Sequence, residues 1–239
     1  MNLVVDFGNS RIKAAVFNGR DLFQSKIFNS VEEVINDKKF YEEASLCMIA
    51  SVTEQHLAFI KALYKKCKLL EFTSSTKSPL KNAYKSTSTL GSDRLAASVG
   101  AFSIYPNKNI LVIDAGTCLK FNFINANGEY LGGAISPGFQ MRFKSLNHFT
   151  KKLPLINLDE NFDKLIGQST EESILSGVIN GIISETDGII DSYKKQFPDL
   201  VIAFTGGDCS FFAKRLKSRI FAHPELILTG LNEILIYNS

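Results

Sequence analysis

Apolar and polar positions along the chain predict short strands and helices in an order that occurs twice. A branched apolar run at residues 3–5 leads into an acidic glycine turn that begins at Asp6, and the strand after it closes on Asn18 and Gly19, a pair typical of a hairpin turn. The run beginning at Ile110 has the same sequence of features and closes on Asn127 and Gly128. We therefore expect two related halves.

Between and after these hairpins, the spacing of apolar residues predicts helices and buried strands. Ser30 and Glu33 have the spacing of a capping box, which predicts a helix from Ser30 to about Ala44. Further helices are expected over 54–67, from 93 to Pro106, just after Pro137, over 169–197 and from near Ser210. Strands are expected near 46–53, 68–75 and 200–205.

This order indicates an α/β protein built from a duplicated mixed unit. The expected boundaries are an N-terminal domain at 1–107 and a C-terminal domain at 108–239. Two copies are too few for a solenoid. We expect the two equivalent acidic turns to face each other across a ligand cleft.

The composition excludes several classes of protein. Hydrophobic residues make up 45% and charged residues 21%, as in globular proteins, and the net charge of +3 forms no basic stripe that would indicate nucleic-acid binding. The apolar runs are too short to span a bilayer, and Asp6 interrupts the N-terminal run where a signal peptide would need its apolar centre. No membrane association and a cytoplasmic location are expected.

The cysteines and histidines show no pattern of a metal site or of a nucleophilic catalytic site. The chain has four widely separated cysteines and three histidines, with no spacing of a zinc site and no GxSxG or Cys/His signature of a nucleophilic hydrolase. Carboxylates are therefore the best candidates for catalysis.

The twin turns, Asp6 to Gly8 and Asp114 to Gly116, are the first candidates. Glycine allows a ligand to approach the backbone, and successive turn amides can hold phosphate oxygens. Neither the Walker A nor the GxGxxG pattern is present. Carboxylates beside phosphate require a cation between them, so the turns indicate ATP with magnesium or a monovalent ion. The alternative is ordinary turn chemistry, which two matched copies make less attractive.

The segment Leu90–Ser98, "LGSDRLAAS", is the second candidate. Asp93 and Arg94 fall in the first turn of an expected helix, where Asp93 could take a proton from an attacking hydroxyl and Arg94 could hold a carboxylate of the acceptor. The structural alternative is that Ser92 caps the helix, Asp93 complements its dipole and Arg94 lies on the surface. The glycine turns "LGGAISPG" and "FTGGD" are weak signals by themselves.

Taken in order, "DFGNS", "GSDR", "DAGTC", "GGAISPG" and "TGGD" make the chain resemble type III pantothenate kinases, of the sugar kinase, heat-shock chaperone and actin superfamily. The resemblance covers roughly residues 1–235. It implies two ribonuclease H-like (actin-like ATPase) domains with mixed sheets. It also implies ATP-dependent phosphorylation of pantothenate to 4'-phosphopantothenate, the first step of coenzyme A biosynthesis, with Mg²⁺ and with K⁺ or NH₄⁺, in a homodimer.

The resemblance also implies residue roles. Asp93 would be the general base, and Asp114 would bind the monovalent cation. The ATP-binding residues would be Asp6, Phe7, Gly8, Asn9, Ser10, Arg11, Ile12, Lys13 and Thr117, with Gly206 and Gly207 near adenosine. Pantothenate would be bound by Tyr84, Gly91, Ser92, Asp93, Arg94 and Thr170.

One segment departs from the family pattern, because Cys118, Leu119 and Lys120 follow "DAGT" where small and hydroxyl residues are common. Lys120 could supply a cation near phosphate or point to solvent, and solvent is the favoured interpretation. Two other functions stay open: a regulatory protein of the transcription accessory kind on the same fold, and a kinase of another small acid or a sugar. Arg94 beside the proposed base favours an acidic acceptor.

Overall fold

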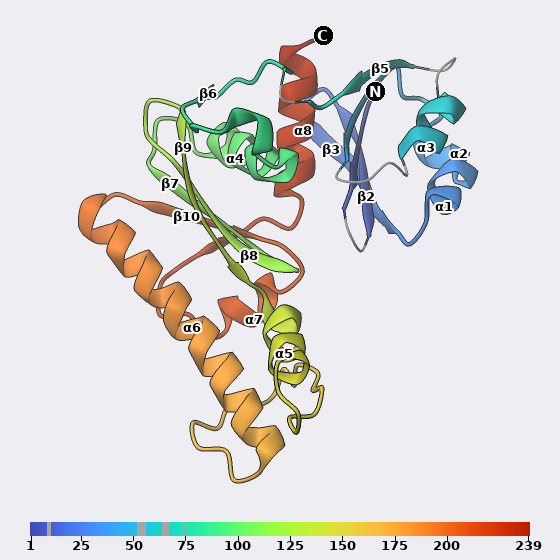
Figure 1. Ribbon diagram of the computed structural model, residues 1–239. Helices are drawn as coiled ribbons and strands as arrows, with labels where there is room; N and C mark the ends of the chain where they lie inside the picture. Colours follow the sequence, from blue (N-terminus) through green and yellow to red (C-terminus); the bar gives the residue numbers. More distant parts are fainter. Residues whose placement is uncertain (9–10, 52–55, 64–66, 74) are drawn as a thin grey trace. The chain divides into compact units, whose positions relative to one another are not determined.

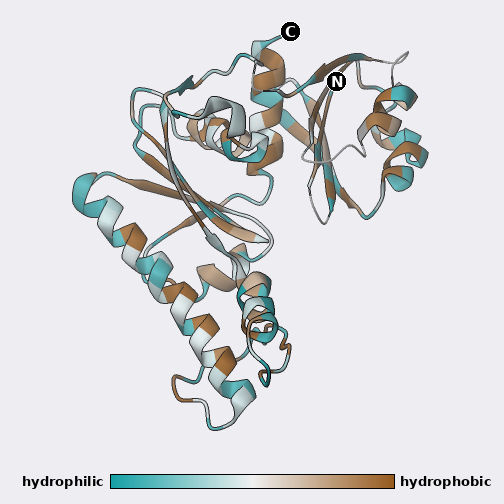
Figure 2. Cartoon of the chain, in the orientation of Figure 1, coloured by the Kyte–Doolittle hydropathy of each residue, from teal (hydrophilic) through white to brown (hydrophobic). Residues whose placement is uncertain are grey.

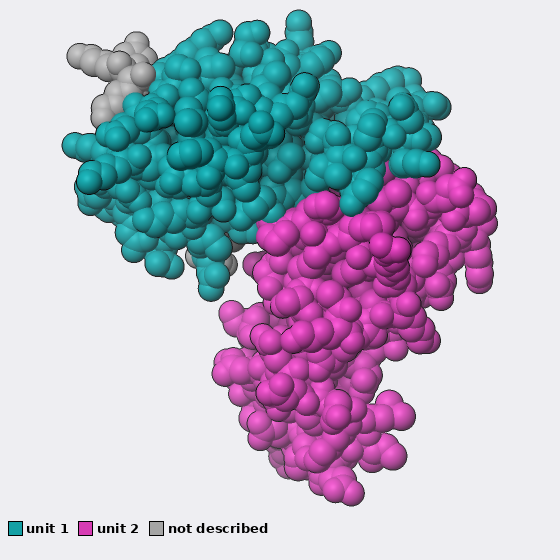
Figure 3. Space-filling view, turned by 180° about the vertical axis from the view of Figure 1, so that it is seen from behind, with its two compact units in different colours: residues 1–108, 124–132, 225–239 teal, residues 109–123, 133–224 magenta. Residues whose placement is uncertain are grey.

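The computed structural model describes residues 1–8, 11–51, 56–63, 67–73 and 75–239 (Figure 1). The chain forms two compact units, coloured separately in Figure 3. The first unit contains Met1–Lys108, Ile124–Gly132 and Glu225–Ser239, and the second contains Asn109–Phe123 and Gly133–Pro224. The expected boundary after residue 107 falls close to the Lys108/Asn109 division, and the assignment of two duplicated domains at that boundary stays a prediction.

The first unit contains a five-stranded mixed sheet in the order β3-β2-β1-β4-β5. Its strands are β1 (Asn2–Phe7), β2 (Ile12–Asn18), β3 (Asp21–Phe28), β4 (Leu46–Ser51) and β5 (Lys68–Glu71). β1, β2 and β3 pair antiparallel as successive hairpins, whereas β4 pairs parallel to β1 and to β5. Gly19 has a positive φ of 60°, as the predicted Asn-Gly turn requires.

The helices of the first unit are α1 (Val31–Asn36), α2 (Lys38–Tyr41), α3 (His56–Leu63), α4 (Ser92–Ile104) and α8 (Leu226–Tyr237), with a 3₁₀ turn at Thr87–Thr89. The Ser30 cap is present, since its hydroxyl accepts from the Glu33 amide at 3.3 Å; the Glu33 carboxylate reaches back one residue beyond the cap and accepts from the Asn29 amide at 2.8 Å. The single helix expected from Ser30 to Ala44 is wrong: Asp37, with φ −84° and ψ 60°, leaves the helical region and separates α1 from α2.

Helix α8 was not expected from the sequence, where the last helix was placed near Ser210. Its apolar residues are buried against α4 and the sheet, and eight of its twelve residues are buried. A run that is apolar on most sides gives no clear helical stripe, because it has no solvent face. α8 therefore joins α4 to the strands β1, β2 and β4 of the first sheet.

The second sheet has the order β11-β10-β7-β8-β9-β6. Its strands are β6 (Lys81–Asn82), β7 (Ile110–Ala115), β8 (Cys118–Ile124), β9 (Glu129–Pro137), β10 (Val201–Thr205) and β11 (Phe221–Ala222). β10 is parallel to β7 and to β11. Without the short β6, this order repeats that of the first sheet, so the duplication expected from the sequence is present in the strand order.

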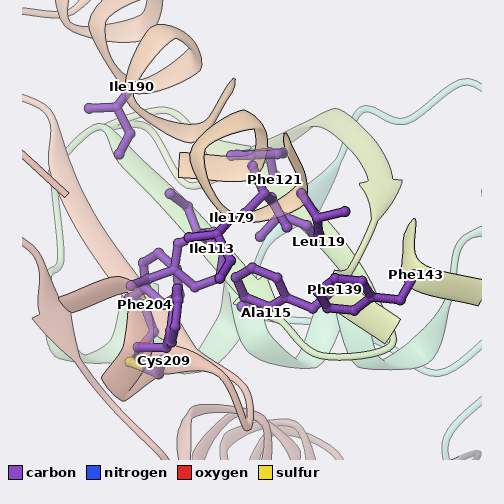
Figure 4. Close-up of a cluster of buried hydrophobic side chains, with 14 of the residues drawn as sticks. Ile113, Ala115, Leu119, Phe121, Phe139, Phe143, Ile179, Ile190, Phe204 and Cys209 are labelled. Atoms are coloured by element: carbon purple, nitrogen blue, oxygen red, sulfur yellow. Dashed lines mark hydrogen bonds between the residues drawn. The ribbon is translucent and has the colours of Figure 1, made fainter. Parts of the chain in front are cut away.

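The second unit has three helices among its described residues: α5 (Phe139–His148), α6 (Thr170–Gln196) and α7 (Cys209–Ala213). Figure 2 shows alternating hydrophobic and hydrophilic bands along α6, as in an amphipathic helix. The core gathers Phe121, Phe139, Phe143, Phe204 and Ile179 (Figure 4). No helix in the described part of the chain is both long enough and apolar enough to cross a membrane.

Candidate functional site

The first acidic turn lies at the end of β1. Asp6 is 9% exposed and stands opposite Lys13 in the β1–β2 register. The Gly8 amide donates to the Arg11 carbonyl at 3.2 Å, which closes the turn. Asn9 and Ser10, two of the expected ATP ligands, lie outside the described residues.

Two other expected ATP-binding residues of this turn have buried side chains. Phe7 and Ile12 belong to the hydrophobic core of the first unit. A nucleotide at this turn would therefore contact the backbone of Phe7 and Ile12 rather than their side chains. The side chain of Arg11 is exposed and that of Lys13 is half-buried.

The second acidic turn is surrounded by backbone from two other glycine segments. The Gly116 amide donates to the Cys118 carbonyl at 3.1 Å, and the Gly138 amide donates to the Thr117 carbonyl at 3.1 Å. A Cβ on Gly138 would lie 2.1 Å from the Gly116 carbonyl oxygen, so only glycine fits there. Thr117 thus lies in a turn with backbone packed directly against it.

Gly206 packs against the same turn and has a positive φ of 96°. A Cβ at this position would lie 2.1 Å from the Ala115 carbonyl oxygen, and that oxygen accepts from the Asp208 amide at 3.1 Å. The segments "DAGTC", "SPG" and "TGGD", weak as separate signals, are therefore brought together by the fold of the second unit. This backbone-lined arrangement is suited to close approach of a phosphate ligand.

Asp208 is a candidate site residue, for binding a cation or a proton, that the sequence analysis missed. Burial raises the pKa of its carboxyl group, and the nearby carboxylates of Glu160 and Asp114 raise it further. Raised carboxyl pKa values are common near sites that receive a cation or a proton. The only signal in the sequence was its position directly after "TGG".

Lys120 does not point to solvent, so the favoured interpretation was wrong. Its Nζ lies 3.0 Å from Asp114 Oδ2. The side chains of Lys120 and Asp114 are only 21% and 11% exposed, which makes this a partly buried ion pair rather than a surface pair.

The segment around Asp93 forms a second cluster, in the first unit. Gly91 is the N-cap residue of α4 and makes no side-chain cap, so the structural alternative, in which Ser92 caps the helix, is wrong on this point. Asp93 lies in the first turn, where its Oδ1 accepts from the Arg94 amide at 2.8 Å. A half-buried carboxylate at a helix N-terminus is favoured by the helix dipole.

Arg94 is buried at 6% exposure rather than on the surface, so the structural alternative does not describe it. Its Cζ lies 5.5 Å from the centroid of the Tyr84 ring, and the Tyr84 and Tyr130 ring centroids are 6.0 Å apart. Burial raises the pKa of Tyr130 to about 12 although Arg94 opposes the shift, so Tyr130 keeps its proton at neutral pH. The fold thus places Arg94, next to Asp93 in the chain, beside Tyr84, and adds Tyr130, which the sequence analysis missed. The role of these residues toward pantothenate stays a prediction.

Gly132 explains how Tyr84 reaches this cluster. Its φ is 103°, and a Cβ there would lie 2.9 Å from Tyr84 Cδ2. The tyrosine ring therefore lies directly over a residue without a side chain.

Thr170 begins α6 in the second unit, where Ser169 supplies the cap by accepting from the Glu172 amide at 3.2 Å. Thr170 also lines a cavity of about 880 Å³, together with Arg142, Leu146, Gly167 and Val178. Its role toward pantothenate stays a prediction.

Comparison with known proteins identifies the family. The family model described as type III pantothenate kinase matches residues 2–192. The chain belongs to the type III pantothenate kinase family. A type III pantothenate kinase of Christiangramia forsetii is 45% identical and one of Cytophaga hutchinsonii is 42% identical, with at least 99% of each chain covered.

Solved structures show the fold of this pantothenate kinase family member. A protein of Campylobacter jejuni described as a Baf family transcriptional activator superposes with a TM-score of 0.65 at 22% identity, covering 99% of this chain and 98% of that one. A ROK hexokinase of Thermus thermophilus gives 0.52 at 11% identity, covering 99% and 98%. With two mixed sheets of repeated strand order, the kinase has the expected α/β fold of two ribonuclease H-like domains.

Proposed function

We propose that this chain transfers the γ-phosphoryl group of ATP to the primary hydroxyl of pantothenate, forming 4'-phosphopantothenate, the first step of coenzyme A biosynthesis. The observation that carries the proposal is the cluster in which Asp93, in the first turn of α4, is followed by the buried Arg94, which lies against the Tyr84 ring. It combines a carboxylate that can accept a proton with a guanidinium that can bind an acidic acceptor.

In this reaction Asp93 accepts the proton of the pantothenate hydroxyl as the hydroxyl oxygen forms its bond to the γ-phosphorus. The bond between that phosphorus and the β–γ bridging oxygen breaks, and ADP leaves with the electron pair. The transition state is loose, so most of the rate comes from positioning and charge stabilisation. The backbone around Gly116 and Gly138 would approach the phosphates, and Thr117 would contact ATP from the same turn.

The first acidic turn suits Mg²⁺, which prefers oxygen ligands, because Asp6 provides carboxylate oxygens at the end of β1. No group of three or more His, Cys, Asp or Glu side chains able to hold a metal was found in the described part of the chain. Mg²⁺ would therefore be held partly by the phosphates, whose charge it neutralises when bound. The implied K⁺ or NH₄⁺ at Asp114 fits less well, since that carboxylate is already paired with Lys120.

The direct test is ATP turnover by the purified protein with pantothenate and Mg²⁺, with glucose and acetate as control acceptors. Turnover that depends on pantothenate is expected. If glucose or another acceptor were phosphorylated instead, the proposed acceptor would be wrong. ATP binding without turnover on any acceptor would support a regulatory protein.

Replacing Arg94 by Lys should weaken pantothenate binding. Lysine keeps the charge but loses the planar fork and the stacking on Tyr84. We expect the KM for pantothenate to rise about 10- to 100-fold, as for loss of a charge-assisted bidentate contact, with a smaller change in kcat. Arg219→Lys is the matched control, because Arg219 lies 5.2 Å from the Phe221 ring but is exposed. An unchanged KM in Arg94→Lys would remove Arg94 from the acceptor site.

A homodimer and a cytoplasmic location complete the proposal. Large apolar side chains are exposed near the start of α6, with Leu165 at 78% and Ile166 at 76%. Contiguous exposed apolar surface is typical of interaction sites. Light scattering should give twice the chain mass, and a monomer at all concentrations would contradict the dimer.

A further inference from the structure

The Asp114–Lys120 ion pair is built into the sheet of the second unit. The turn at Gly116 joins β7 to β8, so that Lys120 returns alongside the strand that carries Asp114. Nζ and Oδ2 are 3.0 Å apart.

Strand alternation fixes the direction of both side chains. Ile113 and Ala115, on either side of Asp114, belong to the hydrophobic cluster of this unit, and so do Leu119 and Phe121 on either side of Lys120 (Figure 4). Because successive side chains point to opposite faces of a sheet, Asp114 and Lys120 both lie on the face away from that cluster. The ion pair therefore does not depend on a chance rotamer at the surface.

This arrangement disagrees with a monovalent metal ion at Asp114. Such an ion needs several oxygen ligands, and the carboxylate that would supply the charge already accepts from an ammonium group. A second cation beside the same Oδ2 would meet the charge of Nζ at short range, in a site with little solvent to screen it.

We propose that Lys120 is a tethered cation that takes the place of K⁺ or NH₄⁺ at the second phosphate turn, so that this kinase is active without either ion. The inference deepens the proposed function and rests on it for its activity readout. A lysine ammonium carries the same charge as K⁺ and the same donor chemistry as NH₄⁺. Because Lys120 is part of β8, its ammonium group is present whatever salt the solution contains.

The test compares the wild type with Lys120→Ala, which removes the cation and opens space beside Asp114. ATP turnover with pantothenate and Mg²⁺ is measured in KCl, NH₄Cl, NaCl and choline chloride at equal ionic strength. For the wild type we expect the four rates to agree within about twofold, because a monovalent cation that has no binding site on the enzyme does not change its active population. For Lys120→Ala in choline we expect a loss of about tenfold or more, with recovery in KCl or NH₄Cl, because a positive group near developing phosphate charge is removed.

Thermal unfolding in the same salts provides a readout that does not need activity. The wild-type midpoint should be the same in KCl and choline chloride, whereas K⁺ should raise the midpoint of Lys120→Ala by binding to the folded protein. Lys26→Met is the control, since it removes a lysine from an exposed ion pair with Asp37 and should acquire no K⁺ response.

A wild-type enzyme that is activated or stabilised by K⁺ relative to choline would overturn the inference, even if Lys120→Ala failed to fold. So would a Lys120→Ala variant that is as active as the wild type in choline. If neither protein phosphorylated pantothenate, the proposed function would fail, and the thermal midpoints would still decide whether Lys120 replaces the ion.

Discussion

Asp93→Asn should lower pantothenate-dependent turnover about 10²- to 10⁴-fold, the range for loss of a general base. Asparagine has nearly the same shape, and its Oδ1 can still accept from the Arg94 amide as Asp93 does at 2.8 Å. It cannot accept the proton of the attacking hydroxyl. The fold of α4 should therefore persist while the chemical step slows.

The measurements are steady-state turnover, ATP affinity by calorimetry and the thermal midpoint. ATP affinity and the midpoint should stay close to the wild-type values, because only the base is changed. Asp21→Asn, at an exposed position at the start of β3, is the matched control and should be fully active. Near-normal turnover in Asp93→Asn would remove Asp93 from the base role.

Gly230→Ala should lower the free energy of unfolding by about 3 kcal/mol, the upper part of the usual range for overpacking. A Cβ at Gly230 in α8 would lie 1.7 Å from the Ala96 carbonyl oxygen and 2.9 Å from the Gly100 amide nitrogen, both in α4. These are backbone atoms, so the two helices would have to separate. Because α4 begins with the Asp93 turn, activity should fall together with stability.

Denaturant unfolding measures this effect, with Gly188→Ala as the control. Gly188 is an exposed residue within α6, and a Cβ there would meet nothing within 4 Å. Alanine should stabilise that helix by up to about 1 kcal/mol, because it loses less backbone entropy than glycine. If Gly230→Ala were as stable as the wild type, the close crossing of α4 and α8 would be wrong.

Features that depend on neighbours in sequence could be predicted. The Asn-Gly hairpins are present, with positive φ at Gly19 and Gly128, and so is the side-chain cap at Ser30. The long helix was expected over 169–197 and extends over Thr170–Gln196. The family motifs also gave the correct fold class, because their order along the chain is specific.

Features that depend on distant segments could not be predicted in the same way. The break at Asp37 between α1 and α2 was missed, and so was α8, because its buried apolar run has no polar face to reveal its period. The packing of Gly138 and Gly206 on the second acidic turn joins segments that are far apart in sequence. Hydrophobic burial is not directional, so the sequence alone does not say which segments will meet.

Lys120 shows the difference between what the sequence determines and what only the tertiary structure decides. The sequence by itself determined the duplicated strand order, the two acidic turns and the Asp93–Arg94 pair, because these follow from local backbone preferences and motif order. Only the tertiary structure decided that Arg94 is buried under Tyr84 and that Lys120 pairs with Asp114. The reason is that a charged side chain takes its partner from whatever the folded sheet places beside it, and strand pairing sets that neighbour.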